Sequence, residues 1–141
     1  MVDTRNYIRQ VIDENRNGEQ SGLFSVCSAN EYVIRSAVRY AKKHQRPVIF
    51  EATANQVNQF GGYTGMEPVH YKDLVQRIAQ EEGMDPGLFI LGGDHLGPLV
   101  WSSLPEKEAM VLASQLVRDY TLAGFSKIHL DTSMRLGDDD P

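Results

Sequence analysis

Short apolar runs alternate with amphipathic stretches along this chain, and most of the apolar runs lead into polar loops. Runs at 23–27, 47–51, 88–91 and 128–131 have the length and composition of buried strands. Stretches at 6–15, 30–44, 69–82 and 103–123 carry apolar residues three and four positions apart, as amphipathic helices do. The pattern therefore predicts strands that alternate with helices.

The helix boundaries have recognisable signals. Ser28 followed by Glu31, and Ser103 followed by Glu106, have the spacing of capping boxes. Gly83 and Gly124 stand where two of the helices are predicted to end.

Alternating strands and helices of these lengths indicate parallel strands joined by right-handed crossovers. Two architectures fit this α/β pattern: an open doubly wound sheet, or half of a (β/α)₈ barrel. The glycine-rich motifs that bind nucleotide phosphates are absent, which weakens the nucleotide-binding interpretation.

The predicted fourth strand is followed by Asp138-Asp139-Asp140-Pro141, without a helix to cover it. We therefore expect residues 1–141 to form a single partial domain of about four βα units, truncated after the fourth strand. Such a unit would expose two unpaired strand edges, so we also expect it to form an oligomer.

Composition narrows the function classes. With 41% hydrophobic and 23% charged residues, the chain has an ordinary globular balance. A net charge of −5 argues against a nucleic-acid binder, and no apolar run approaches the roughly 20 residues of a membrane span. The start, residues 1–5, lacks the apolar core of a signal peptide. The single cysteine, Cys27, is expected to be a small buried residue in a reducing cytoplasm.

Polar side chains that could do chemistry follow the predicted strands. In parallel βα folds the functional groups gather at the carboxyl ends of strands. Asp94-His95 is the sharpest signal there, because imidazole is a common metal ligand and a carboxylate can act as acid or base. The alternative is that His95 is a hydrogen-bonded loop histidine. His129, inside a predicted strand, is expected to be a structural histidine.

Other residues near these strand ends are candidates for substrate binding. Glu51 and Asp131 could orient substrate hydroxyls or a metal ligand, or pair with a lysine or arginine. Gly92 and Gly93 would let the backbone approach a substrate closely. Ser133 could bind a phosphate or hydroxyl, or cap a following helix.

The segment from 52 to 70 is long for a connection between a strand and a helix. Long connections in compact domains are typically lids or binding loops. The amides of Asn55 and Gln59 suit sugar hydroxyls, and the glycines suit movement. We therefore expect this segment to border the substrate.

Three stretches resemble one known family closely. They are Glu51–Met66, Leu91–Pro98 followed by Trp101, and most of Ala123–Met134. Together they are similar to signatures of the non-catalytic subunits of D-tagatose-1,6-bisphosphate aldolase, of the GatZ/KbaZ type. The resemblance covers essentially the whole chain and matches the N-terminal third of such subunits.

The resemblance implies a TIM (β/α)₈ barrel, of which this chain would be the N-terminal half. It implies a stabilising role beside a catalytic class II aldolase subunit, with a sugar phosphate as substrate, in galactitol, tagatose or N-acetylgalactosamine catabolism. Asp94-His95 also resembles the Asp-His pair of class II aldolases. Carried over, Asp94 would be the catalytic acid/base and His95 a ligand of a divalent metal, zinc first among them. The alternative is a metal-dependent ketose-phosphate 4-epimerase or aldolase that acts through these two residues.

Overall fold

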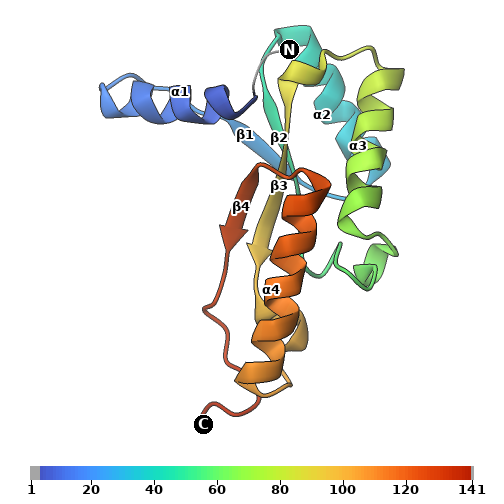
Figure 1. Cartoon of the computed structure of the whole chain (residues 1–141). Helices are drawn as coiled ribbons and strands as arrows, with labels where there is room; N and C mark the ends of the chain where they lie inside the picture. The colour runs from blue at the N-terminus through green and yellow to red at the C-terminus, as the bar shows by residue number, and fades with distance from the viewer. Residues whose placement is uncertain (1–3, 141) are drawn as a thin grey trace.

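The computed structural model describes residues 4–140 and confirms that strands alternate with helices (Figure 1). The main elements, in chain order, are α1 (Thr4–Arg16), β1 (Phe24–Cys27), α2 (Glu31–His44), β2 (Val48–Thr53), α3 (Pro68–Glu81), β3 (Phe89–Leu96), α4 (Glu106–Ala123) and β4 (Lys127–Leu130). Three short 3₁₀ turns, η1 (Gly62–Thr64), η2 (Pro86–Leu88) and η3 (Pro98–Trp101), lie in the connections.

The four strands form one parallel sheet in the order β1-β2-β3-β4. A doubly wound sheet reverses its strand order at a switch point, whereas a (β/α)₈ barrel adds its strands in sequence. The sequential order therefore favours the barrel alternative. The fold is α/β, and its arrangement is that of half a barrel.

Helices α2, α3 and α4 pack side by side over one face of the sheet (Figure 1). Along β2, Val48, Phe50 and Ala52 point into this helix-covered core and are fully buried. The intervening residues Ile49 and Glu51 therefore face the opposite side, because successive side chains of a strand alternate. This second face corresponds to the inside of a barrel.

The structure corrects both predicted capping boxes. Asn30, not Ser28, caps α2, since its side chain accepts hydrogen bonds from the backbone N–H groups of Tyr32 and Val33. A terminus needs some acceptor for its free N–H groups, and α4 finds one far along the chain.

At α4 the capping position is Pro105, which has no side-chain acceptor, and Asp138 accepts the bond from the Glu106 N–H at 2.7 Å. A carboxylate from the C-terminal segment thus replaces the predicted contribution of Ser103. Gly124 ends α4 in the left-handed conformation, as predicted.

Strand β3 is longer than predicted. The sequence indicated a strand at 88–91 followed by a loop, but β3 continues through Leu96. Gly92, Gly93, Asp94 and His95 therefore belong to the sheet, and this places the Asp-His pair on a strand.

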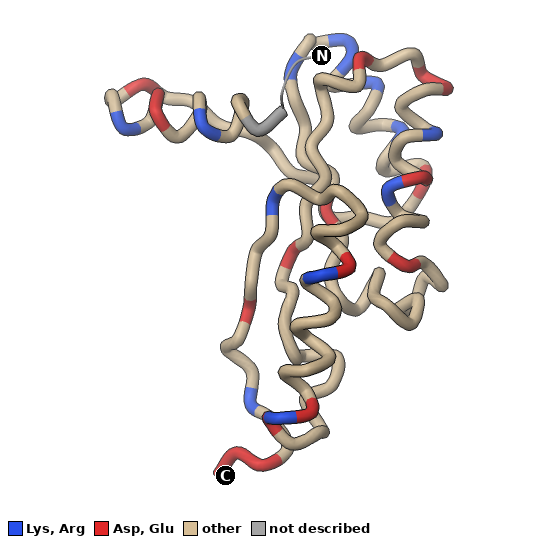
Figure 2. Tube along the Cα trace, in the orientation of Figure 1, with Lys and Arg blue, Asp and Glu red and all other residues tan. Residues whose placement is uncertain are grey.

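Basic and acidic residues lie near one another along α2 and α3 (Figure 2), and their side chains form ion pairs between the two helices. Arg35 contacts Glu81 at 2.6 Å and Glu82 at 2.9 Å, and Arg77 of α3 contacts Glu31 of α2 at 3.1 Å. Exposed ion pairs contribute little to stability one by one, and more where several charges form a network, as these do. Among residues 4–140, no helix combines the length and apolar character that crossing a lipid bilayer requires.

Candidate functional site

Charged side chains gather on the face of the sheet that the helices leave uncovered. One register row joins Glu51 on β2, Gly92 on β3 and Lys127 on β4. Asp94 and His129 come two residues after Gly92 and Lys127, so they lie on the same face, nearer the carboxyl ends. This is the edge of a parallel sheet at which functional groups collect.

A β-bulge brings the Asp-His pair together with a second histidine. The pairing register shifts between Gly93 and Leu96, so Asp94 and His95 of β3 together oppose the single residue His129 of β4. His95 has φ +50°, in the left-handed region that residues other than glycine seldom adopt. Bulges re-aim side chains, and here the ring centroids of His95 and His129 lie 4.6 Å apart.

The Asp94 carboxylate lies between the two imidazoles. Its Oδ1 is 2.9 Å from Nδ1 of His129, its Oδ2 is 3.1 Å from Nδ1 of His95, and Nζ of Lys127 is 3.6 Å from Oδ1. Burial would raise the pKa of Asp94, but hydrogen bonds from both histidines and the charge of Lys127 outweigh it and lower the pKa to about 2. Asp94 is therefore ionised at neutral pH, which suits it to accept hydrogen bonds or bind a cation.

The lowered pKa predicts a loss of stability in acid. Because the pKa of Asp94 falls from 3.8 to about 2 on folding, its contribution is present above pH 3.8 and is lost as the pH falls toward 2. As the pH falls through this range, the free energy of unfolding should decrease by about 1–2 kcal/mol less in Asp94→Asn than in the wild type. Urea unfolding of the metal-free chain at several pH values measures this difference. Glu82, whose pKa the guanidinium groups of Arg39 and Arg35 also lower to about 2, loses its contribution in both proteins. Equal acid sensitivity in wild type and variant would contradict the assigned hydrogen bonds.

Asp94, His95 and His129 form a group that could hold a metal ion. Their ligand atoms lie within 4.8 Å of one another. Two imidazoles and a carboxylate make a donor set that zinc and other divalent first-row metals accept. The histidine side chains are about half exposed, at 53% for His95 and 46% for His129, so an ion could reach them.

Glu51, Gly92 and Gly93 were predicted to contact substrate, and each lies against other residues of the chain. Glu51 is 3% exposed and forms an ion pair with Lys127. A Cβ on Gly92 would lie 2.8 Å from Oε1 of Glu51, and a Cβ on Gly93 would lie 2.5 Å from Cδ1 of Leu96. The geometry thus supports the pairing of Glu51 with a lysine, one of the two roles that the sequence left open. Substrate contacts of these three residues stay predictions.

Asp131 and Ser133 are bound to each other just beyond β4. Oδ1 of Asp131 accepts hydrogen bonds from the backbone N–H of Ser133 at 2.9 Å and from its hydroxyl at 2.7 Å, and these bonds lower the pKa of Asp131. Within residues 131–140 the chain forms no helix, so Ser133 caps none there. Substrate binding by the two side chains stays a prediction.

The Gln59 amide of the long connection contacts a helix rather than a strand end. The Gln59 amide donates to the backbone carbonyl of Leu112 on α4 at 3.0 Å, and Asn55 is exposed. Asn58, 4% exposed, donates to the carbonyl of Ala54 and so anchors the connection from within. These hydrogen bonds hold the connection against the rest of the domain. Substrate binding by Asn55 and Gln59 stays a prediction.

Sequence reasoning gave no role to Lys127 and only a structural role to His129. A usable signal was present, because Lys127 and His129 occupy alternate positions of one strand and therefore share a face.

Cys27 is exposed rather than buried as predicted. Partial burial and the negative charges of Asp94 and Glu51 raise its pKa to about 11. The thiol therefore stays protonated and unreactive at neutral pH.

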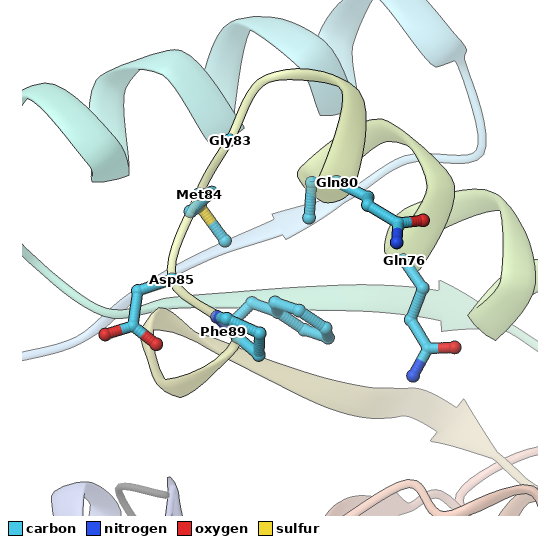
Figure 3. A pocket seen from close by; sticks show the side chains of 8 residues that line it. Gln76, Gln80, Gly83, Met84, Asp85 and Phe89 are labelled. Carbon is cyan, nitrogen blue, oxygen red and sulfur yellow. The ribbon is translucent and has the colours of Figure 1, made fainter.

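A hollow of about 650 Å³ lies at the opposite end of the sheet (Figure 3). It is bordered by Gln76 and Gln80 of α3, by Met84 and Asp85 of the following turn, and by Phe89 at the start of β3. Because functional sites of parallel sheets gather at the carboxyl ends of the strands, this hollow is not the candidate site.

Comparisons with known proteins all point to one family. A family model described as D-tagatose-1,6-bisphosphate aldolase subunit GatZ/KbaZ-like matches residues 8–141. The chain is 51% identical over 132 residues to D-tagatose-1,6-bisphosphate aldolase subunit GatZ of Salmonella agona (strain SL483), covering 94% of this chain and 31% of the relative. The same protein of Salmonella gallinarum gives the same values.

A crystal structure of a probable tagatose 6 phosphate kinase from Sinorhizobium meliloti 1021 is also similar. Its TM-score is 0.82 at 46% identity, over 84% of this chain and 31% of that chain. The chain thus spans 31% of the length of the relatives that it matches.

Proposed function

Because the chain belongs to the GatZ/KbaZ-like family of D-tagatose-1,6-bisphosphate aldolase subunits, we propose that it is part of the non-catalytic subunit that stabilises a class II aldolase of this kind. The observation that carries the proposal is the family match, which extends over residues 8–141. The partner is then a catalytic class II aldolase subunit, and the substrate of the complex is a sugar phosphate. The complex would work in the cytoplasm, in the catabolism of galactitol, tagatose or N-acetylgalactosamine.

Exposed apolar surface supports assembly with further protein. Beside β4 a hollow of about 300 Å³ is lined mainly by apolar side chains, among them Leu96, Met110 and Val117. Leu130, on the same border, is 60% exposed. Apolar surface of this kind is typical of faces that another segment or subunit covers, so we propose that the chain works in an oligomer.

We further propose that Asp94, His95 and His129 hold a divalent metal, with zinc the best match to a carboxylate and two imidazoles. Such an ion supplies a Lewis acid that polarises a substrate carbonyl when it is bound. In the metal-free site the ionised Asp94 accepts hydrogen bonds from Nδ1 of both imidazoles and so keeps the three side chains together. The uncovered face of the sheet leaves room for the substrate.

The same cluster favours a second candidate function. A metal-dependent ketose-phosphate 4-epimerase or aldolase would need a proton-transfer group beside its metal, and Asp94 is the carboxylate in that place. Asp94 is ionised at neutral pH and so can accept a proton, and its low pKa favours passing that proton on to another group.

Replacing Asp94 by alanine distinguishes the two functions. We expect the catalytic partner, mixed with the Asp94→Ala chain, to keep aldolase activity and thermal half-life within about twofold of the values with wild type, because a stabilising subunit acts through its surface. The same substitution is made at the matching position of a full-length family member, with circular dichroism to verify folding. If turnover instead falls by about 100-fold or more with the fold intact, the catalytic alternative replaces our proposal.

A further inference from the structure

The ion pair between Glu51 and Lys127 reaches across an intervening strand. Glu51 lies on β2 and Lys127 on β4, and Gly92 of β3 stands between them in the same register row. Since a Cβ on Gly92 would lie 2.8 Å from Oε1 of Glu51, the missing side chain is what lets the two charges meet. The side chains of Glu51 and Lys127 are 5% and 29% exposed, so the pair is shielded from bulk water.

The same ammonium faces the candidate metal site. Nζ of Lys127 is 3.6 Å from Oδ1 of Asp94, the oxygen that also accepts the hydrogen bond from His129. One cation therefore separates two carboxylates, those of Glu51 and Asp94. Without it the two negative charges would repel each other across a poorly solvated space, and Asp94, the more exposed of the two, would turn away.

We propose that Lys127 is a positioning residue: anchored by Glu51 across the gap at Gly92, it holds the Asp94 carboxylate between the imidazoles of His95 and His129. The inference builds on the proposed role of those three side chains as a metal site. Lys127 acts through Asp94 and touches neither the ion nor the substrate.

The position of the proton on each histidine ring reports this arrangement without a metal. An ionised carboxylate only accepts hydrogen bonds, so neutral His95 and His129 must carry their protons on Nδ1. The Nδ1–H tautomer of the two rings therefore reports, in the metal-free chain, that Asp94 lies between them. His70 provides the opposite reference, because its Nδ1 accepts from the backbone N–H of Glu67 at 3.2 Å and its proton lies on Nε2.

The test is nitrogen-resolved NMR of the histidine rings in the metal-free chain, at a pH at which the spectra show both rings to be neutral. In the wild type we expect Nδ1–H signals for His95 and His129. Lys127→Gln, which can still hydrogen-bond Glu51, should lose the Nδ1–H signal of His129, and Lys127→Arg should keep it. The His70 signal should stay unchanged in every variant and reports that the fold is intact.

Retention of the His129 signal in Lys127→Gln would overturn the proposal, and so would its loss in Lys127→Arg with His70 unchanged. A wild-type measurement covers the case in which Lys127→Gln does not fold. The carbon-bound ε protons of Lys127, which do not exchange with water, should then show cross-peaks to the β protons of Asp94, and their absence would overturn the proposal. Zinc titration of the same samples is read separately, so failure of the metal site is distinguishable from failure of Lys127 as its positioning residue.

Discussion

The Gly97→Ala variant is expected to lose at least about 3 kcal/mol of its free energy of unfolding, because the new methyl group would collide with the backbone. A Cβ on Gly97 would lie 1.7 Å from the carbonyl oxygen of Asp131. Neither group can give way cheaply, since the backbone N–H of Asp131 is hydrogen-bonded to the carbonyl of Leu96 at 3.0 Å. The chain after β3 and the chain after β4 would have to separate, beside the bulge that carries Asp94.

Gly22→Ala is the matched control. Gly22 has no atom within 4 Å of its would-be Cβ, so the same chemical change meets open space. Its stability should change by no more than about 1 kcal/mol. Urea unfolding followed by circular dichroism measures both variants. A Gly97→Ala chain as stable as Gly22→Ala would contradict the described approach of the two segments.

The second large effect is expected at His129. His129→Ala should weaken zinc binding by about 100-fold or more, because it removes one of two imidazoles and a hydrogen bond that fixes Asp94. The side chain is 46% exposed, so its removal leaves no sizeable cavity and the fold should persist. Calorimetric titration of the metal-free chain with zinc measures the change.

His44→Ala provides the comparison for this variant. His44 lies at the exposed end of α2, where its ring centroid is 4.4 Å from that of Tyr40, on a helix that covers the other face of the sheet. Its loss should leave zinc affinity unchanged within about threefold. Equal affinities of the His129→Ala and His44→Ala chains would remove His129 from the proposed site.

The order of elements could be predicted because apolar periodicity decides it. Strand β2 was predicted because Val48-Ile49-Phe50 is a short continuous apolar run. The structure adds that Phe50 is buried beneath the helices while Glu51 lies on the opposite face. The extent of β3 could not be predicted in this way. Gly92 and Gly93 are typical of loops, and only the packed structure shows that their missing side chains make room for Glu51 and Leu96.

The candidate site was predictable in part. Asp94 and His95 were found because a polar pair after an apolar run predicts chemistry at a strand end. His129 was missed because its partner is 35 positions away, and the bulge that aligns the two is a tertiary feature with no local signal. The predicted cap of α4 was wrong for a similar reason. Asp138, which accepts the hydrogen bond from the Glu106 N–H at the start of α4, is 32 positions away in the sequence.

Asp94, His95 and His129 are proposed to form one metal site on the uncovered face of the sheet. Anomalous diffraction at the zinc absorption edge, from crystals of the chain grown with zinc, tests this site directly. We expect a peak bonded to side-chain atoms of all three residues. Zinc bound elsewhere, for example at His44 or His70, with no peak among these three side chains, would contradict it.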